Sequence, residues 1–217
     1  MDVALGLSVT PKEVRGVLVD RVTGENAPVA RYALAFADVE EFDAEGFLET
    51  LLGDEVVLTV GLTWTADAER VAIKVYEALS VLGGGAPSVV VSELEAGDVL
   101  TRGIADVTGD KYLIVCIVEA DGVIVASLDE QHMTVDRFAD DELGPVTDRV
   151  CAAVRRVHPR PDRILVLGSE DGDELVTALR DMTTRPVFTA GEGAFALTQG
   201  VALASVRAAH AVKTPER

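Results

Sequence analysis

Apolar residues near the N-terminus follow a period of two over three short segments. These segments are separated by the sequences TPKE and TGENAP, and they cover residues 3–8, 14–20 and 29–36. Alternation of this kind, bounded by Pro, Gly and Asn, is typical of β-strands joined by turns. We therefore predict a three-stranded antiparallel meander at the start of the chain.

The residues that follow change to helical spacing, interrupted by short apolar runs. Helical spacing covers residues 39–54, 65–85 and 92–109, and the apolar runs cover residues 56–62 and 88–91. The helix over 65–85 has a Thr or Asp N-cap candidate and ends in glycines. The short runs are typical of strands that are covered on both faces. The pattern predicts helix, strand, helix, strand, helix after the meander.

The second half of the chain repeats this order. Strands are predicted over 111–120, 122–130 and 133–139, with an Asp121-Gly122 hairpin turn between the first two. After them we predict three helices and two strands in alternation. The helices cover 143–158, 171–184 and 191–210, and the strands cover 163–169 and 186–190. We predict an α/β fold with two lobes, each β-β-β-α-β-α-β-α. The lobes cover residues 1–109 and 110–210, and residues 211–217 form a polar tail.

Composition limits the classes of partner. The 217 residues include 37 acidic and 19 basic ones, so the formal charge of −18 repels nucleic acid and anionic lipid. Cys116 and Cys151 lie in apolar patterns and are predicted to be core residues. The N-terminus lacks the features of a signal peptide, and no apolar run reaches the length of a membrane span. We expect a cytoplasmic protein that binds no nucleic acid and does not insert into membranes.

Metal and nucleotide motifs give little signal. His132, His158 and His210 are isolated, without the spacing of metal ligands, and are predicted to be surface residues. The acidic sequence GSEDGDE is more typical of a helix N-terminus than of a calcium loop. Phosphate-binding and dinucleotide motifs, and a nucleophile elbow, are absent from the sequence. We expect no metal site and no catalytic residue.

Three short stretches carry a resemblance to a known superfamily. These are VLGS at 166–169, GEGAFALTQGVALAS at 191–205 and SELEAGDVLTRG at 92–103. They resemble the adenosine motif and two helices of the actin, sugar-kinase and heat-shock-seventy superfamily. The chain also resembles an actinobacterial, largely mycobacterial, group of chaperone-like proteins of unknown function, in LGLSVTPKEVRGVLV and in GLTWT. The resemblance implies two ribonuclease-H-like lobes, the actin-like ATPase fold in a minimal form.

The phosphate-binding hairpins of that superfamily are altered here. Where active members resemble DLGTT, this chain has GLSVT, so Gly6 takes the place of the Asp and Ser8 that of a Gly. Where they resemble DLGGGTFD, it has CIVEADGVI, with Cys116 at the Asp and Val118 and Glu119 at glycines. A carboxylate near a triphosphate repels it unless a cation intervenes. We expect no cofactor, and ATP, which the resemblance implies, is disfavoured.

Five residues are candidates for lining a cleft between the lobes. Ser8 and Thr10 retain hydroxyl donors, Glu93 matches a motif Glu of the superfamily, and Gly168 and Ser169 belong to the adenosine-like motif. Gly168 and Ser169 equally suit a strand that turns into a helix N-cap, and Glu93 equally suits a helix start. The only tryptophan, Trp64, lies at a strand end, where it lines a cleft or caps the core.

Loss of the phosphate motifs favours a protein without ATPase activity that acts as an interaction or scaffold module. One alternative is an ATPase that has rebuilt its site from Ser8, Thr10, Glu119 and Ser169. Another is a sensor that binds a small molecule in the inter-lobe cleft. We expect a protein partner, or a homodimer formed through an open strand edge of a meander.

Overall fold

The described part of the chain folds into two compact units. The computed structural model describes residues 2–20, 28–82, 84–140, 145–168, 172–190 and 193–213. Unit 1 comprises Met1–Ala96 and Thr198–Arg217, and unit 2 comprises Gly97–Leu197. Each unit is built around one five-stranded mixed sheet within the described residues.

The sheet of unit 1 has the order β3-β2-β1-β4-β5. Its strands are β1 Asp2–Val9, β2 Glu13–Asp20, β3 Pro28–Ala35, β4 Val56–Trp64 and β5 Ser88–Val90. The first three strands are antiparallel, and β4 and β5 continue the sheet in parallel on the other side of β1. The predicted meander is therefore confirmed, with β2 as its middle strand, and β1 is the central strand of the whole sheet.

The sheet of unit 2 has the same connectivity in the order β10-β9-β6-β7-β8. Its strands are β6 Tyr112–Glu119, β7 Gly122–Asp129, β8 His132–Ala139, β9 Arg163–Gly168 and β10 Val187–Thr189. Strands β6 to β8 are antiparallel, whereas β9 pairs in parallel with both β6 and β10. The internal repeat and the α/β class predicted from periodicity are both confirmed.

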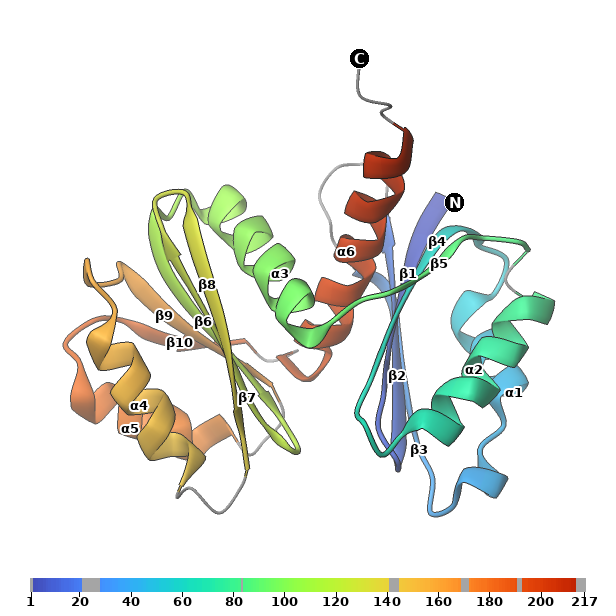
Figure 1. The fold of residues 1–217 in the computed structure, drawn as a ribbon, viewed down its shortest axis with the longest axis horizontal. Helices are drawn as coiled ribbons and strands as arrows, with labels where there is room; N and C mark the ends of the chain where they lie inside the picture. Colours follow the sequence, from blue (N-terminus) through green and yellow to red (C-terminus); the bar gives the residue numbers. More distant parts are fainter. Residues whose placement is uncertain are drawn as a thin grey trace. The chain divides into compact units, whose positions relative to one another are not determined.

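Two helices cover one face of the unit 1 sheet, and a third covers the opposite face (Figure 1). On the first face α1, Ala44–Leu52, and α2, Glu69–Leu82, pack on alternate apolar residues of the strands. Phe47 and Val75 from these helices are buried with Leu5 and Leu7 of β1. The opposite face is covered by α6, Ala196–Lys213.

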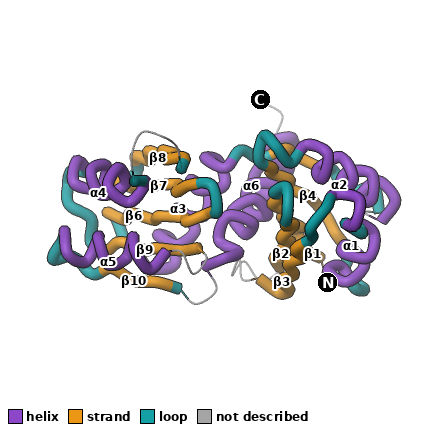
Figure 2. Tube along the Cα trace, turned by 90° about the horizontal axis from the view of Figure 1, so that it is seen from below, coloured by secondary structure: helices purple, strands orange, loops and turns teal. Residues whose placement is uncertain are grey.

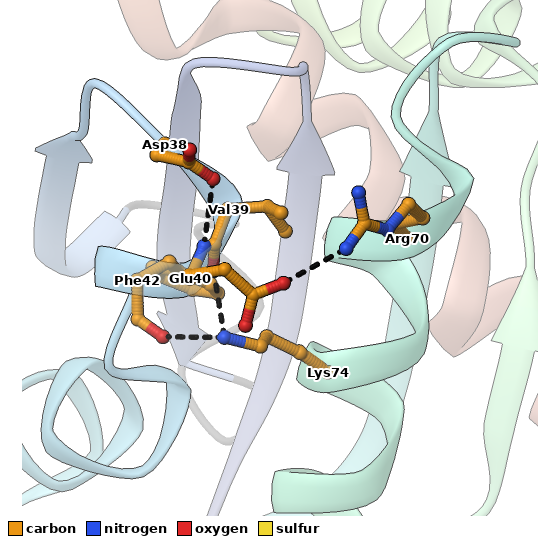
Figure 3. A network of polar contacts seen from close by, with 6 residues as sticks. All are labelled: Asp38, Val39, Glu40, Phe42, Arg70 and Lys74. Atoms are coloured by element: carbon orange, nitrogen blue, oxygen red, sulfur yellow. Dashed lines mark hydrogen bonds and ion pairs between the residues drawn. The ribbon is translucent and has the colours of Figure 1, made fainter.

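A polar network fixes the segment before α1 to α2 (Figure 3). At the end of the short 3-10 helix η1, Val39–Glu41, the carbonyl of Val39 accepts from the N–H of Phe42 at 3.3 Å. The ammonium of Lys74 donates to the carbonyl of Val39 at 2.7 Å and to that of Phe42 at 3.5 Å. Arg70 pairs with Glu40 at 2.8 Å, but both side chains are exposed, so this pair contributes at most about 1 kcal/mol.

Unit 2 has the corresponding arrangement of helices. Helices α4, Val146–Arg156, and α5, Gly172–Met182, pack on one face with β6, β7 and β9, while α3, Glu93–Thr108, covers the other (Figures 1 and 2). Gly97 brings the α3 backbone close to the sheet, because a Cβ there would lie 3.1 Å from Ile124 and 3.4 Å from Val135. The hydrophobic core between the sheet and helices α4 and α5 contains Cys116, Val150 and Leu179.

The division of the chain differs from the predicted boundary between residues 109 and 110. Most of α3 belongs to unit 2 and α6 belongs to unit 1, so each unit is completed by a helix from the other half of the sequence. Small residues on one face of β1 and β4 provide the physical reason, because they allow α6 to lie directly on that sheet. The last helix also continues to Lys213, into the segment predicted as a polar tail, and residues 214–217 lie outside the described residues.

Candidate functional site

The turn between β1 and β2 is closed by hydrogen bonds within the turn itself. The backbone N–H of Thr10 donates to the carbonyl of Glu13 at 2.9 Å, and the N–H of Glu13 donates to Thr10 Oγ1 at 3.0 Å. Thr10 Oγ1 also donates to the Glu13 carbonyl at 3.0 Å. Pro11 has no N–H to offer a ligand. The hydroxyl of Thr10 therefore stabilises the turn, and the loop is too tight to surround a phosphate.

Ser8 is part of a buried contact with the C-terminal helix. The residue is 9% exposed, and Ser8 Oγ lies 2.7 Å from Thr198 Oγ1 in the first turn of α6. A buried hydroxyl needs such a partner, because an unpaired one costs about 1–3 kcal/mol. The structure therefore gives Ser8 a role in packing α6 onto β1.

Gly6 lies where α6 approaches the sheet most closely. A Cβ at this position would be 2.2 Å from the carbonyl oxygen of Thr198 and 2.6 Å from the amide nitrogen of Ala202. Real Cβ atoms do not make contacts this short, so one of the two backbones would have to move. The position that corresponds to the superfamily's Asp has no room for a carboxylate that could hold a metal through its hydration shell.

A line of small residues extends this contact, and we call it the α6 seam. On the sheet it comprises Gly6, Ser8, Thr59 and Gly61, and on the helix Thr198, Val201, Ala202 and Ser205. Gly61 pairs with Gly6 across β1 and β4, and a Cβ at Gly61 would lie 2.4 Å from the carbonyl of Val201. A second buried hydroxyl pair joins Thr59 to Ser205 at 3.1 Å. The face of β1 that carries Gly6 and Ser8 is thus filled by protein.

The second hairpin is likewise occupied by packed side chains. Cys116, at the position of the superfamily's second Asp, is fully buried, and burial raises the pKa of its thiol to about 12. Burial also raises the pKa of Cys151, in the same core. Val118 is 6% exposed and belongs to this core as well. These side chains do not fit a metal or a triphosphate.

The hairpin turn differs by one residue from the predicted one. Glu119 pairs with Gly122, so the loop consists of Ala120 and Asp121, and Gly122 begins β7. Gly122 has a φ of 153°, and a Cβ there would lie 2.3 Å from the carbonyl of Phe138. Close approach of β8, rather than the turn geometry, therefore requires glycine at this position.

Gly168 allows three pieces of backbone to meet at the end of β9. Its φ is 145°, a value that favours glycine, and a Cβ would lie 2.4 Å from the carbonyl of Val118. The 3-10 helix η2, Gly193–Phe195, reaches the same place, since a Cβ at Gly193 would lie 2.3 Å from the amide of Gly168. Backbone from β6 and η2 contacts Gly168 here. Ser169, the other residue of the adenosine-like motif, lies outside the described residues.

Glu93 lies at the start of a helix, and Trp64 lies at the end of a strand. Glu93 is the half-buried first residue of α3, whose start is capped by the Ser92 hydroxyl accepting from the N–H of Glu95 at 3.2 Å. Trp64 ends β4 and packs against the hydrophobic core of unit 1. Roles of the two residues in lining a cleft stay predictions.

The structure brings only some of the candidates into one unit. Ser8, Thr10 and Glu93 belong to unit 1, whereas Gly168 belongs to unit 2. Among the described residues, no group of three or more His, Cys, Asp or Glu side chains is placed to hold a metal ion. None of the helices described is long and apolar enough to cross a membrane.

Sequence reasoning missed the helix residues that contact Ser8 and Gly6. The signal was present on the strands, where large residues alternate with small ones in VALGLSV at 3–9 and in TVGLTW at 59–64. Alternation of this kind indicates that one face of the sheet receives a closely packed backbone. It did not identify which helix supplies that backbone.

Comparisons with known proteins agree with the fold. Nothing among the curated proteins matches the sequence. A chain of the PilM-PilN type IV pilus biogenesis complex aligns with a TM-score of 0.64 at 12% identity, covering 94% of this chain and 98% of that chain. For component A of (R)-2-hydroxyglutaryl-CoA dehydratase from Acidaminococcus fermentans the TM-score is 0.63 at 10% identity, covering 97% and 100%.

A sugar kinase gives a similar result. The ROK family glucokinase from Streptomyces griseus, solved with glucose and AMPPNP, aligns with a TM-score of 0.60 at 12% identity, covering 94% of this chain and 99% of that chain. At these identities the likeness shows the fold, and the chain has the actin-like ATPase fold that its sequence resemblance predicts. The model of a family of unknown function, DUF7159, matches residues 2–216, and the chain belongs to this family.

Proposed function

We propose that this protein uses the actin-like ATPase fold without hydrolysing ATP and acts by binding another protein. The observation that carries the proposal is the α6 seam. In this seam, Gly6 stands where the superfamily has its metal-holding Asp, and the backbone of Thr198 covers Gly6. An enzyme that transfers phosphoryl groups depends on metal ions and backbone N–H groups placed around the phosphates, and this strand end offers neither a carboxylate nor an open loop.

The two hairpins support this proposal independently of each other. In unit 1, Thr10 and Glu13 close the turn that would have to surround a phosphate. In unit 2, Cys116 is a neutral buried thiol where the superfamily has a carboxylate. If only one hairpin had lost its phosphate-binding residues, nearby residues could compensate. Here both hairpins lack the Asp, and both lack glycines that would leave backbone N–H groups open to a phosphate.

Binding of a protein partner is the role that such a fold can still perform. Among proteins of the same fold, PilM is found in a complex with PilN. For the present chain, we propose a role of this general kind, in which the fold offers surfaces to a partner and has no turnover of its own.

Nucleotide binding and hydrolysis provide the test. We expect the melting temperature of the purified chain to be unchanged by ATP with Mg²⁺, and phosphate release to stay at the level of a heat-denatured sample. An active actin-like kinase serves as the positive control. A ligand at a hundred times its dissociation constant adds about 2.7 kcal/mol of stability, which raises the melting temperature by several degrees. A saturable rise with ATP would support a rebuilt site, and magnesium-dependent turnover would contradict the proposal.

A further inference from the structure

A small hollow at the end of α4 is lined by cationic and hydroxyl-bearing side chains. It has a volume of about 230 Å³, and its floor includes the apolar side chains of Ile164 and Met182. Its polar lining consists of Arg155, His158, Arg160, Thr183, Thr184 and Arg185. None of the described residues that line it is Asp or Glu. The hollow therefore presents donors for an anion and no side chain that repels one.

The exposed arginines around this hollow form no ion pair with any residue that the structure describes. In the part of the chain that the structure describes, the guanidinium groups of four exposed residues take part in no ion pair and no hydrogen bond: Arg155, Arg156, Arg160 and Arg185. We call these four residues the arginine surface. Other arginines pair with acids, as Arg102 does with Asp98 and Arg163 with Asp110, both at 2.9 Å.

This lack of pairing is unexpected in so acidic a protein. With 37 acidic and 19 basic residues, most cations can find a carboxylate nearby. Instead, the four arginines without an ion pair to a described residue lie within residues 155–185. Arg155 and Arg156 in the last turn of α4 interact favourably with the helix dipole. That effect does not explain Arg160, which lies beyond the helix, or Arg185, which lies between α5 and β10.

A larger hollow continues the surface along α4. It has a volume of about 760 Å³ and lies between α4 and strands β7 and β8. Arg156 and Phe138 line it together with two acidic residues of the sheet, Asp129 and Asp136, and Val157 and His158 line both hollows. Figure 2 shows α4 beside β7 and β8 and close to α5. The two hollows together are longer than a single small anion would need. The smaller one, which has three of the four arginines and no Asp or Glu among its described lining residues, is the part suited to carboxylates.

We propose that the arginine surface binds an acidic segment of a partner protein in extended conformation. Guanidinium groups bind carboxylates through paired, charge-assisted hydrogen bonds, and the apolar floor accepts the aliphatic side chains between them. The net charge of −18 repels long polyanions such as nucleic acid, whereas a short acidic segment needs only the local arginines. This inference rests on the proposed function as a partner-binding protein and specifies the chemistry of the partner.

Binding of a model peptide to the full chain tests the proposal. The probe is a fluorescein-labelled peptide of about twelve residues in which glutamates alternate with serine and leucine, followed by fluorescence anisotropy. We expect saturable binding that weakens at least about tenfold when salt is raised from about 50 to about 200 mM, because screening shortens the range of the charges. A peptide with glutamine in place of each glutamate should not bind.

Matched arginine variants locate the site. Arg160→Gln with Arg185→Gln should weaken binding about tenfold or more, whereas Arg70→Gln with Arg102→Gln, which removes the same charge elsewhere, should change it less than about twofold. Arg70, Arg160 and Arg185 are exposed and Arg102 is half-buried, and an unchanged melting temperature confirms that each variant is folded. Arg155→Gln with Arg156→Gln provides a second pair with the same expected loss.

Several outcomes would overturn the inference. No binding of the acidic peptide, or equal binding by both double variants, would show that the arginine surface does not recognise carboxylates. Tighter binding of a single-stranded oligonucleotide than of the acidic peptide would assign the surface to nucleic acid. ATP turnover would contradict the proposed function, whereas loss of peptide binding would contradict only the role of the arginine surface. The two failures are distinguishable because they are measured in separate assays.

Discussion

Gly6 is the residue at which the superfamily's chemistry and the packing of this protein exclude each other. An Asp at this position would place a side chain 2.2 Å from the Thr198 carbonyl and would also bury a charge. The missing carboxylate therefore has a structural reason, because the backbone of α6 occupies the space that it would need. An acidic residue could not be introduced at this position unless the backbone of β1 or of α6 moved.

Substitution of Gly6 tests this conflict directly. We expect Gly6→Asp to lower the free energy of unfolding by roughly 2–4 kcal/mol, through overpacking and burial of a carboxylate, without creating ATP hydrolysis. Urea denaturation followed by circular dichroism measures the change. Ala33→Asp on the exposed side of β3 introduces the same side chain as a control and should change stability little. Wild-type stability of Gly6→Asp would show that α6 does not press on this residue.

Cys116 predicts a dependence of stability on pH. Burial raises the pKa of its thiol to about 12 in the folded protein, whereas in the unfolded chain the thiol ionises near pH 8.5. The folded state retains the proton between these values, so stability is fully present below about pH 8.5 and falls as pH rises toward about 12. The slope for one thiol is at most about 1.4 kcal/mol per pH unit.

Unfolding at two pH values measures this effect. Between pH 8 and pH 10, the wild-type protein should lose roughly 1–2 kcal/mol more than Cys116→Ala, because the variant has no thiol to ionise at this position. Equal losses in the two proteins would mean that Cys116 is accessible to solvent. Cys151→Ala, at a less buried position of the same core, controls for the loss of a thiol as such.

Helix α6 stabilises unit 1 through close packing and two buried hydroxyl pairs. The helix can approach the sheet because Gly6 and Gly61 have no side chains, and Ser8 and Thr59 then bond to Thr198 and Ser205. Small residues on both surfaces bring the two backbones together, and each hydroxyl needs its partner once water is excluded. The effects of substituting the two partners of one hydroxyl pair should therefore not add.

A double-mutant cycle on Ser8 and Thr198 measures that coupling. Ser8→Ala and Thr198→Val should each cost about 1–2 kcal/mol, since each leaves the other hydroxyl buried without this partner. The double variant should be about 1 kcal/mol more stable than the sum of the single effects predicts. Thr50→Ala removes an exposed hydroxyl that donates to the carbonyl of Gly46, and should cost less than about 0.5 kcal/mol. Strict additivity of the cycle would argue against the buried pair.

Periodicity was sufficient to predict the type and order of the elements. Alternation in β1 and β2 and helical spacing in α2 each indicate one element, because a buried face must recur at the period of the backbone. The same patterns do not identify the partner of a buried face. The small residues of α6 would suit either sheet, and only the glycines on β1 and β4 show which sheet the helix covers.

The candidate site could be predicted less well. The sequence alone shows that Gly6 and Cys116 stand where the superfamily motifs have Asp. It does not show that the Ser8 hydroxyl bonds to Thr198, which is almost two hundred residues away in the chain. The sequence analysis considered only the net charge of the whole chain, which hides local clusters. The stretch RRVHPRPDR at 155–163 is basic and was the signal for the arginine surface. Roles of Glu93, Gly168 and Ser169 in binding a ligand remain predictions.

At the scale of the whole molecule, each compact unit needs a helix from the other half of the chain. Residues 1–109 contain all strands of the first sheet but lack α6, so the face with Gly6 and Gly61 would be exposed to water. An uncovered apolar sheet face leads to aggregation. We therefore predict that the two halves of the sequence repeat do not fold independently, even though their connectivity is the same.

Rebuilding unit 1 from its two segments tests this last point. In unit 1 the chain near Gly200 lies against Ala96, since a Cβ at Gly200 would be 2.4 Å from the Ala96 carbonyl, so a short Gly and Ser linker can join residue 96 to residue 196. We expect residues 1–96 linked to 196–213 to be monomeric in size-exclusion chromatography and to melt cooperatively, and residues 1–109 to aggregate. The same fusion with the order of residues 196–213 scrambled has equal length and composition, and it should behave like 1–109 because Thr198, Ala202 and Ser205 no longer meet the strands. If residues 1–109 alone melt cooperatively, the first half of the repeat folds without α6 and the lobe boundary expected from the sequence is the better description.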